Sequence, residues 1–182
     1  MREITMRVLR HAFVLSLMIL SGCSFGPGIE ESLVFGTLGE WDHTTAVTQE
    51  VPGKYFSIEQ VRKGDDFQNW YELLTMQNFA RPWGGATPAA ALEELKAVRE
   101  KRCPGVTVWN VIEQDETSIL YEWQARMCAG WPEQHELARI FYGVNNVWLM
   151  RYTVKEYTMT AEQREEMLKT LRSARVVTEP SS

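Results

Sequence analysis

Few residues of this sequence have the types and spacing that nucleophilic or acid–base catalysis needs. Outside the N-terminal apolar segment the chain has two histidines, His43 and His135, and it has no Gly-x-Ser-x-Gly motif. His43 follows Asp42 and could form a dyad with it, although such a pair more often caps an element or lies on the surface. The sequence therefore favours a protein that is not an enzyme. A hydrolytic site formed by two carboxylates from distant positions is still compatible with the sequence, because such a pair leaves no local pattern.

Metal ligands are also sparse. His135 lies close to Glu133 and Glu136, but residues one to two positions apart seldom converge on one ion. The acidic pairs at 65–66 and 115–116 lack the pattern of a calcium loop, so we interpret them as solvated turns. We expect neither a metal nor a cofactor.

Three residues could instead form an interaction surface. The segment RPWGGATP displays Arg81 and Trp83 on a frame of Gly and Pro, where they could contact a partner or a sugar. The alternative is a turn whose Trp covers the core. Trp109 is expected on the face of a hairpin opposite to its inward residues, either in an exposed apolar patch or, as we favour, in a second layer of core.

The two cysteines Cys103 and Cys128 flank a predicted hairpin. Residues 105–113 and 117–125 read as strands around a polar turn, and a register centred there pairs residues whose numbers add to 231. The same register places the two cysteines opposite each other, within the Cα separation that a disulfide bridges. We therefore expect a disulfide, with two free buried thiols as the alternative.

The N-terminus has the layout of a secretory signal. Arg2, Arg7 and Arg10 precede an apolar run at residues 12–20, which is shorter than the roughly 20 residues of a membrane-spanning helix. The run ends in a tetrad that resembles the lipobox of bacterial lipoproteins: Leu20, Ser21, Gly22 and Cys23.

The lipobox resemblance implies a lipid anchor on Cys23. In that class a diacylglyceryl group is attached to the thiol, a peptidase cuts before it, and the new amine is usually acylated. Two or more acyl chains hold a protein stably on a membrane, whereas one holds it marginally. Ser24 follows the cysteine, in place of the Asp that is typical of inner-membrane retention. The resemblance thus implies an outer-membrane lipoprotein that faces the periplasm.

The composition excludes one class of partner. Removal of residues 1–22 leaves 16 basic and 23 acidic residues, a net charge of −7. Nucleic-acid binding needs a basic face, so it is disfavoured. The seven Trp residues indicate either a well-filled core or an aromatic binding strip.

The chain is divided here into a cleaved signal peptide (1–22), a lipidated flexible tether (23–40), a single domain (41–177) and a disordered tail (178–182). Thr87 before Pro88 and the Thr-x-x-Gln box at Thr160 predict two helix starts. Strands are expected at residues 44–50, 55–62, 68–79, 105–113 and 117–125 and in a hairpin over 136–157. The turn of that hairpin is expected around Asn145 and Asn146, in a register that pairs residues whose numbers add to 291, such as Glu136 with Lys155 and Phe141 with Met150.

The predicted fold class is α+β, with a mainly antiparallel sheet of about six to seven strands, two helices packed on it, and the order βββ-α-ββββ-α. Residues 137–154 are apolar on both faces, so the sheet should be covered on each side. Over residues 41–177 this order resembles the PsbP-like group of small α/β sandwich domains, some of which occur in exported bacterial lipoproteins.

The preferred functional hypothesis is a non-enzymatic envelope lipoprotein that binds another protein or supports an envelope assembly. The alternative is a periplasmic module that binds a glycan or small molecule with an aromatic-rich surface. A third hypothesis is an envelope hydrolase. A pocket lined by Trp and Tyr would favour the ligand-binding module, and a flat exposed apolar patch would favour the protein partner.

Overall fold

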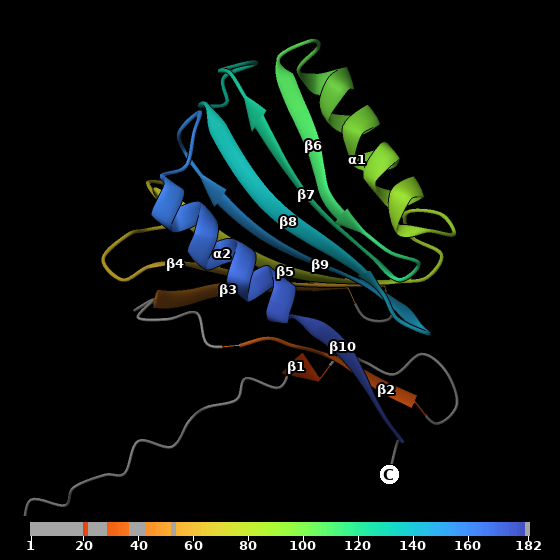
Figure 1. Ribbon diagram of the computed structural model, residues 1–182. Helices are drawn as coiled ribbons and strands as arrows, with labels where there is room; N and C mark the ends of the chain where they lie inside the picture. The colour runs from red at the N-terminus through yellow and green to blue at the C-terminus, as the bar shows by residue number, and fades with distance from the viewer. Residues whose placement is uncertain (1–19, 22–28, 37–42, 52–53, 181–182) are drawn as a thin grey trace, which may run out of the picture.

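The computed structural model describes residues 20–21, 29–36, 43–51 and 54–180. In this part of the chain, two α-helices pack on opposite faces of a seven-stranded sheet, and a second sheet of three strands lies beside one face (Figure 1). The expected α+β class and the order of three strands, a helix, four strands and a helix are confirmed for the large sheet.

The seven-stranded sheet is antiparallel throughout and has the spatial order β3-β4-β5-β9-β8-β7-β6. Its strands are β3 (His43–Val51), β4 (Tyr55–Arg62), β5 (Glu72–Ala80), β6 (Thr107–Gln114), β7 (Ser118–Ala125), β8 (Gln134–Tyr142) and β9 (Asn146–Val154). The β5–β9 pairing joins the N-terminal three strands to the C-terminal four, so that the central strands are buried on both faces.

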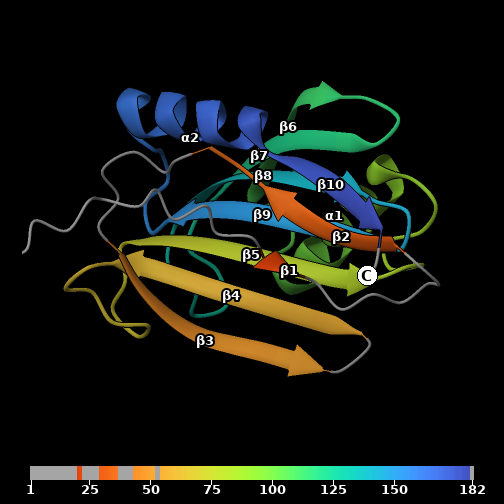
Figure 2. The ribbon, with the colours of Figure 1, turned by 90° about the horizontal axis from the view of Figure 1, so that it is seen from below.

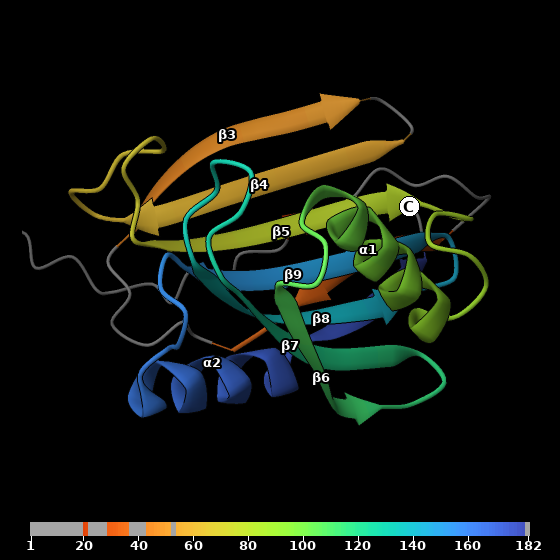
Figure 3. The same cartoon turned by 90° about the horizontal axis from the view of Figure 1, so that it is seen from above.

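Helix α1 (Pro88–Arg102) lies on one face of the sheet, over β7 and β8 (Figure 3). The hydroxyl of Thr87 accepts a hydrogen bond from the backbone N–H of Ala90, as expected for an N-cap before Pro88. Leu92 and Ala91 are buried in a core that also contains Ile140. Because the apolar stripe is narrow, most of the helix surface is left to polar side chains.

Helix α2 (Ala161–Ser173) packs on the other face, together with the three-stranded sheet (Figure 2). Thr160 and Gln163 form the expected capping box. Met167 and Leu171 are buried in a core with Trp148 of β9. Both faces of the large sheet are therefore covered, as its two-sided apolar strands predicted.

The small sheet is a feature that the sequence did not predict. Its order is β1-β2-β10, from β1 (Leu20–Ser21), β2 (Ile29–Val34) and β10 (Arg175–Pro180), with Leu33 of β2 fully buried in the core under α2. The expected tether over 23–40, the domain start at Trp41 and the tail from 178 are thus wrong for residues 29–36 and 178–180. The physical reason is that β2 and β10 pair along their whole length. Most of the expected signal peptide, and Cys23, lie outside the described residues.

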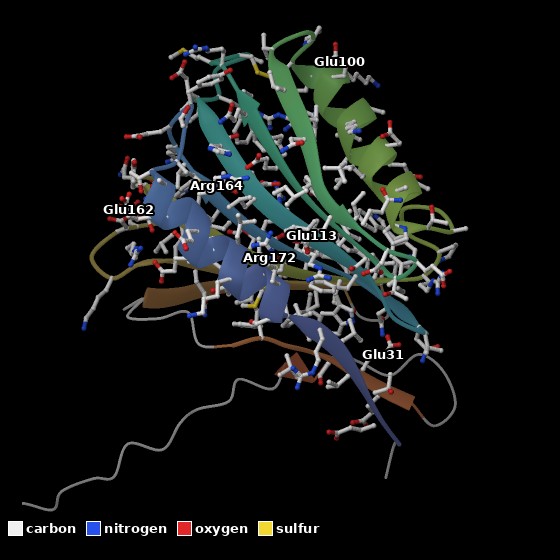
Figure 4. All side chains as sticks on the ribbon, viewed as in Figure 1. Glu31, Glu100, Glu113, Glu162, Arg164 and Arg172 are labelled. Carbon is white, nitrogen blue, oxygen red and sulfur yellow. A yellow bond between two sulfur atoms is a disulfide. The ribbon has the colours of Figure 1, made fainter. Side chains whose placement is uncertain are left out.

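Glu31 joins the small sheet to the turn between β8 and β9 (Figure 4). Its buried carboxylate accepts hydrogen bonds from the backbone N–H groups of Val144, Asn145 and Asn146. The turn is therefore centred on residues 144–145. Gly143 is required there, since an added Cβ would lie 2.6 Å from the Glu31 carboxylate.

This turn corrects the expected register of the β8–β9 hairpin. Glu136 pairs with Thr153 rather than Lys155, and Phe141 pairs with Trp148. The numbers of paired residues therefore add to two less than expected. Such a shift leaves every side chain on its predicted face, because side chains alternate along a strand.

The β6–β7 hairpin differs by one residue, and this changes its faces. Asp115 accepts hydrogen bonds from the backbone N–H groups of Thr117 and Ser118, so the turn centres one position later than expected. A bulge between Val111 and Glu113 then shifts the register again. Trp109 is opposite Trp123, on the same face, and not on the opposite face as predicted.

Among the described residues, no helix has the length and apolar character that crossing a membrane requires.

Candidate functional site: a groove lined by arginine and tryptophan

A groove lies between the C-terminal half of α1 and the face of the large sheet beneath it. It consists of two adjoining hollows of about 240 and 320 Å³, which share Arg99, Arg102, Glu136 and Arg151. We call it the α1 groove. The remaining lining residues come from the strands, the helix and two loops: Glu59, Trp70, Leu73, Thr75, Leu95, Val98, Cys103, Trp109, Tyr121, Trp123, Trp131, Gln134 and Thr153.

Glu136 of β8 is the fixed anion at the centre of the groove floor, and its side chain is 1% exposed. Its Oε1 accepts a hydrogen bond from the indole Nε1–H of Trp123 at 2.8 Å. Its Oε2 accepts from Arg151 Nη2 at 2.6 Å and Nε at 3.0 Å, and from the hydroxyl of Thr153 at 3.0 Å. One buried carboxylate thus holds an indole and a guanidinium in place.

Arg151 of β9 connects this buried anion to solvent. Its side chain is 34% exposed, and its Nη1 makes no hydrogen bond with the described residues. Burial acts to lower the pKa of Arg151, but the carboxylate of Glu136 outweighs it and raises that pKa. The guanidinium is therefore a permanent cation whose remaining donors can reach a ligand in the groove.

Arg99 and Arg102, in the last turn of α1, bring two more guanidinium groups. Arg99 lies 3.6 Å from the ring centroid of Trp123, and Arg102 lies 5.5 Å from that of Trp131. Neither forms an ion pair with any residue that the structure describes. Burial lowers the pKa of Arg99, and the like charges of Arg151 and Arg102 lower it further, against the carboxylate of Glu136. The cations are close enough to repel one another.

The aromatic side chains of the groove form its apolar part. Trp109 lies 6.0 Å from Trp123 and 5.9 Å from Tyr121, measured between ring centroids. Trp131 is 47% exposed on the loop that follows β7. An aromatic wall beside a cation binds the flat or apolar part of a ligand whose charged part the cation pairs with.

A disulfide links the end of α1 to the loop that carries Trp131, and both line the groove. Cys103 is the C-cap of α1, Cys128 lies in the loop that carries Trp131, and their Cα atoms are 5.8 Å apart. The expected pairing of these cysteines is therefore present. It does not cross the hairpin as the sequence reasoning assumed, because β6 begins only at Thr107.

This arrangement suits binding rather than proton transfer. Each oxygen of Glu136 already accepts hydrogen bonds from protein donors. The exposed guanidinium groups do not exchange protons near neutral pH, and Glu59 adds a single half-exposed carboxylate to the described lining. Three guanidinium groups and the two carboxylates of Glu136 and Glu59 leave one net positive charge in the groove.

The sequence-predicted residues fall in two places. Trp109 lies in the α1 groove, half-buried, although on the face opposite to the expected one. Trp83 stacks on Phe79 at a centroid distance of 4.1 Å, so it covers the core beside α1. Arg81 donates to the carbonyl of Gly143 and lies 5.0 Å from the ring centroid of Tyr142. The loop with Arg81 and Trp83 is thus held by its own side chains.

Of the two histidines weighed for chemistry, the one whose side chain is described, His135, is not part of the groove. The side chain of His43 lies outside the described part of the chain. His135 is buried on the α2 face, where its Nδ1 accepts from the N–H of Met159 and its Nε2 is 3.6 Å from Glu122. Burial lowers the pKa of His135 despite that carboxylate. Glu122 is also bound by Arg164 of α2 at 2.8 Å, so this cluster fastens the helix to the sheet (Figure 4).

A larger hollow of about 580 Å³ lies between β10 and the β6–β7 and β8–β9 turns, and it is more open to solvent. Its central cation, Arg139, already donates to the hydroxyl of Ser118 and to the carbonyl of Leu171. A second cation of this hollow, Arg81, donates to the carbonyl of Gly143, so two of its guanidinium groups are already hydrogen-bonded to the protein.

Sequence reasoning missed Arg99, Arg102, Glu136 and Arg151 as a group. They come from a helix and two strands and leave no local motif. Two features pointed in this direction: cations gathered in the last turn of the helix, and two charged residues, Glu136 and Arg151, on mainly buried central strands.

Compared with known proteins, the chain matches no protein-family model, and no curated protein matches it significantly. The resemblance to PsbP-like domains therefore stays a prediction. The functional argument depends on the geometry of the groove.

Proposed function

We propose that this protein is a lipid-anchored component of a bacterial cell envelope whose folded domain binds an anionic ligand in the α1 groove. The address is supported by the basic N-terminus, the short apolar run and the lipobox-like tetrad ending in Cys23. Ser24 supports an outer-membrane position that faces the periplasm. The disulfide between Cys103 and Cys128 fits an oxidising compartment.

The position of β2 limits how far the domain reaches from the lipid. Only the five residues 24–28 separate Cys23 from Ile29, the first residue of β2, and the six steps between the two Cα atoms span at most about 20 Å. Cleavage before Cys23 would remove β1 and leave β2 paired with β10. The small sheet then lies on the membrane side. Helix α1 is on the opposite face of the large sheet (Figures 2 and 3), so the α1 groove that it lines faces away from the small sheet.

One observation carries the ligand-binding proposal: three guanidinium groups converge on the groove, and two of them have no carboxylate partner among the described residues. Arg99 and Arg151 are half-buried and Arg102 is exposed. Their like charges repel, so a bound anion relieves an unfavourable interaction that the groove otherwise retains. The remaining donors of Arg151 and Arg102 supply charge-assisted hydrogen bonds to it.

The size of the groove favours a small ligand over a protein surface. Small-molecule sites have volumes of about 300–1,000 Å³. Of the two hollows, the one of about 320 Å³ is at the low end of that range and the one of about 240 Å³ is just below it. Stable protein interfaces cover about 800 Å² on each partner. A protein partner is the second candidate, supported by two exposed apolar side chains in the groove lining, Val98 at 65% and Trp131 at 47%.

The proposal is tested with anilinonaphthalene sulfonate, a fluorescent aromatic monoanion. We expect one molecule to bind per chain, and Arg102→Gln to weaken binding about tenfold, the effect of losing one charge-assisted contact. Lys101→Gln is the matched control, because Lys101 carries the same charge on the same helix but does not line the groove. Equal binding by the two variants would contradict the proposal.

The proposed lipid anchor on Cys23 is tested separately. Cys23→Ala should stop lipidation, so that the protein no longer partitions with detergent and no longer sediments with membranes. A variant that partitions like the native protein would refute the anchor.

A further inference from the structure

The polar and aromatic groups that line the α1 groove restrict the class of ligand further than its positive charge alone does. From these groups we infer that the anionic ligand is a carboxylated sugar chain, with its carboxylate at Arg102 and Arg151 and its rings against Trp131 and Trp109. This inference depends on the proposed anion-binding function and specifies its ligand class.

The charge balance favours a carboxylate over a phosphate ester. Arg99, Arg102 and Arg151 face Glu136 and Glu59, which leaves one positive charge for the ligand to neutralise. A carboxylate carries one negative charge and fits the fork of a guanidinium. A phosphate dianion would bring a second charge that nothing in the described groove pairs with, at a cost in desolvation.

The polar lining favours hydroxylated rings over an aromatic acid. The hollow of about 320 Å³ within the α1 groove is lined by Thr75, Gln134 and Thr153 as well as by tryptophans. The amide N–H groups of Gln134 and the hydroxyl of Thr75 can pair with sugar hydroxyls. An apolar ring would cover the same groups without hydrogen-bonding them, which is unfavourable.

The shape favours more than one ring. Two hollows adjoin and share their four charged residues, so the carboxylate-binding groups lie at the junction with an aromatic side chain on each side, Trp109 in one hollow and Trp131 in the other. Trp131 is nearly half exposed, so a pyranose ring can pack on it without displacing protein. Linked sugar rings can therefore occupy both hollows at once.

The experiment measures displacement of anilinonaphthalene sulfonate from the full domain, with calorimetric titration in parallel. The probes are an aldotriouronate, in which one uronic acid is linked to two neutral sugar rings so that the molecule carries a single carboxylate, neutral maltotriose and glucose phosphate. We expect the aldotriouronate to bind at least tenfold more tightly than maltotriose. Arg102→Gln should weaken its binding about tenfold, and Trp131→Ala about fivefold, whereas Lys101→Gln should change it less than twofold.

Two results would overturn the inference and are separable from failure of the proposed function. If dye binding depends on Arg102 but only glucose phosphate, or none of the sugars, displaces the dye, the anion site stands and the carboxylated-sugar assignment is wrong. Equal displacement by maltotriose and the aldotriouronate also refutes it. If dye binding is the same in Arg102→Gln and Lys101→Gln, the proposed function itself fails.

Discussion

Replacing Glu136 by Gln removes the buried negative charge that organises the groove floor. The amide must turn its NH₂ group toward either the Trp123 indole N–H or the donors of Arg151 and Thr153, so at least one donor meets a donor. Breaking a buried ion pair by removing one partner costs about 3–5 kcal/mol. Since a third of the Arg151 side chain is exposed and stays hydrated, we expect a loss of about 2–3 kcal/mol in the free energy of unfolding.

The assay is equilibrium unfolding in urea at pH 7, followed by tryptophan fluorescence. With a slope of about 2–3 kcal/mol per molar urea, the midpoint should fall by about 1 M. Glu133→Gln is the matched control, because Glu133 forms an ion pair with Arg126 in which both side chains are more than one third exposed. It should cost no more than about 0.5 kcal/mol. Equal midpoints for the two variants would refute the role given to Glu136.

Three further predictions concern other parts of the fold. Reduction of the Cys103–Cys128 bond, which closes a loop with a sequence separation of 25, should lower the free energy of unfolding by about 3 kcal/mol; an unchanged urea midpoint would contradict this. Gly143→Ala should destabilise the protein by about 1–3 kcal/mol because the new Cβ meets the carboxylate of Glu31, and the loss should shrink in a Glu31→Ala background, so additive losses would refute the contact. Burial acts to raise the pKa of Asp115, but hydrogen bonds within its turn outweigh burial and lower that pKa to about 2. The stability that the ionised form contributes is present above about pH 4 and is lost as the pH falls toward 2. The free energy of unfolding of Asp115→Asn should therefore depend less on pH in this range, and an equal dependence in the variant and the native protein would exclude this contribution.

The helices and the order of strands could be predicted because local patterns specify them. Thr87 with Pro88 and the Thr160 capping box each satisfy N–H groups at a helix start, whatever the rest of the fold does. The two-sided apolar pattern of β8 and β9 likewise depends only on burial of both faces of a central strand.

Registers were harder to predict because distant contacts decide them. Glu31, more than a hundred residues earlier in the chain, centres the turn between β8 and β9. The Asp115 turn and the bulge after Val111 moved Trp109 to the other face of its hairpin. A turn composition that admits several centres cannot distinguish these registers without the contacts themselves.

The small sheet and the α1 groove have the same explanation. A stretch with Gly and Pro before Ile29 is typical of a tether, and only pairing with β10 makes residues 29–34 a strand. Glu136 and Arg151 read individually as charged residues on strands. Their pairing with each other, and their position beside Arg99, depends on β8 and β9 being neighbours under the end of α1.

The most direct test of the groove is a two-dimensional proton–nitrogen spectrum of the indole N–H groups during titration with anilinonaphthalene sulfonate. The account predicts that the resonances of Trp109, Trp123 and Trp131 shift together and saturate at one molecule per chain. The resonance of Trp148, buried in the core under α2, should stay in place. Shifts that are largest at Trp148, or absent from the three groove tryptophans, would contradict the claim that this groove binds anions.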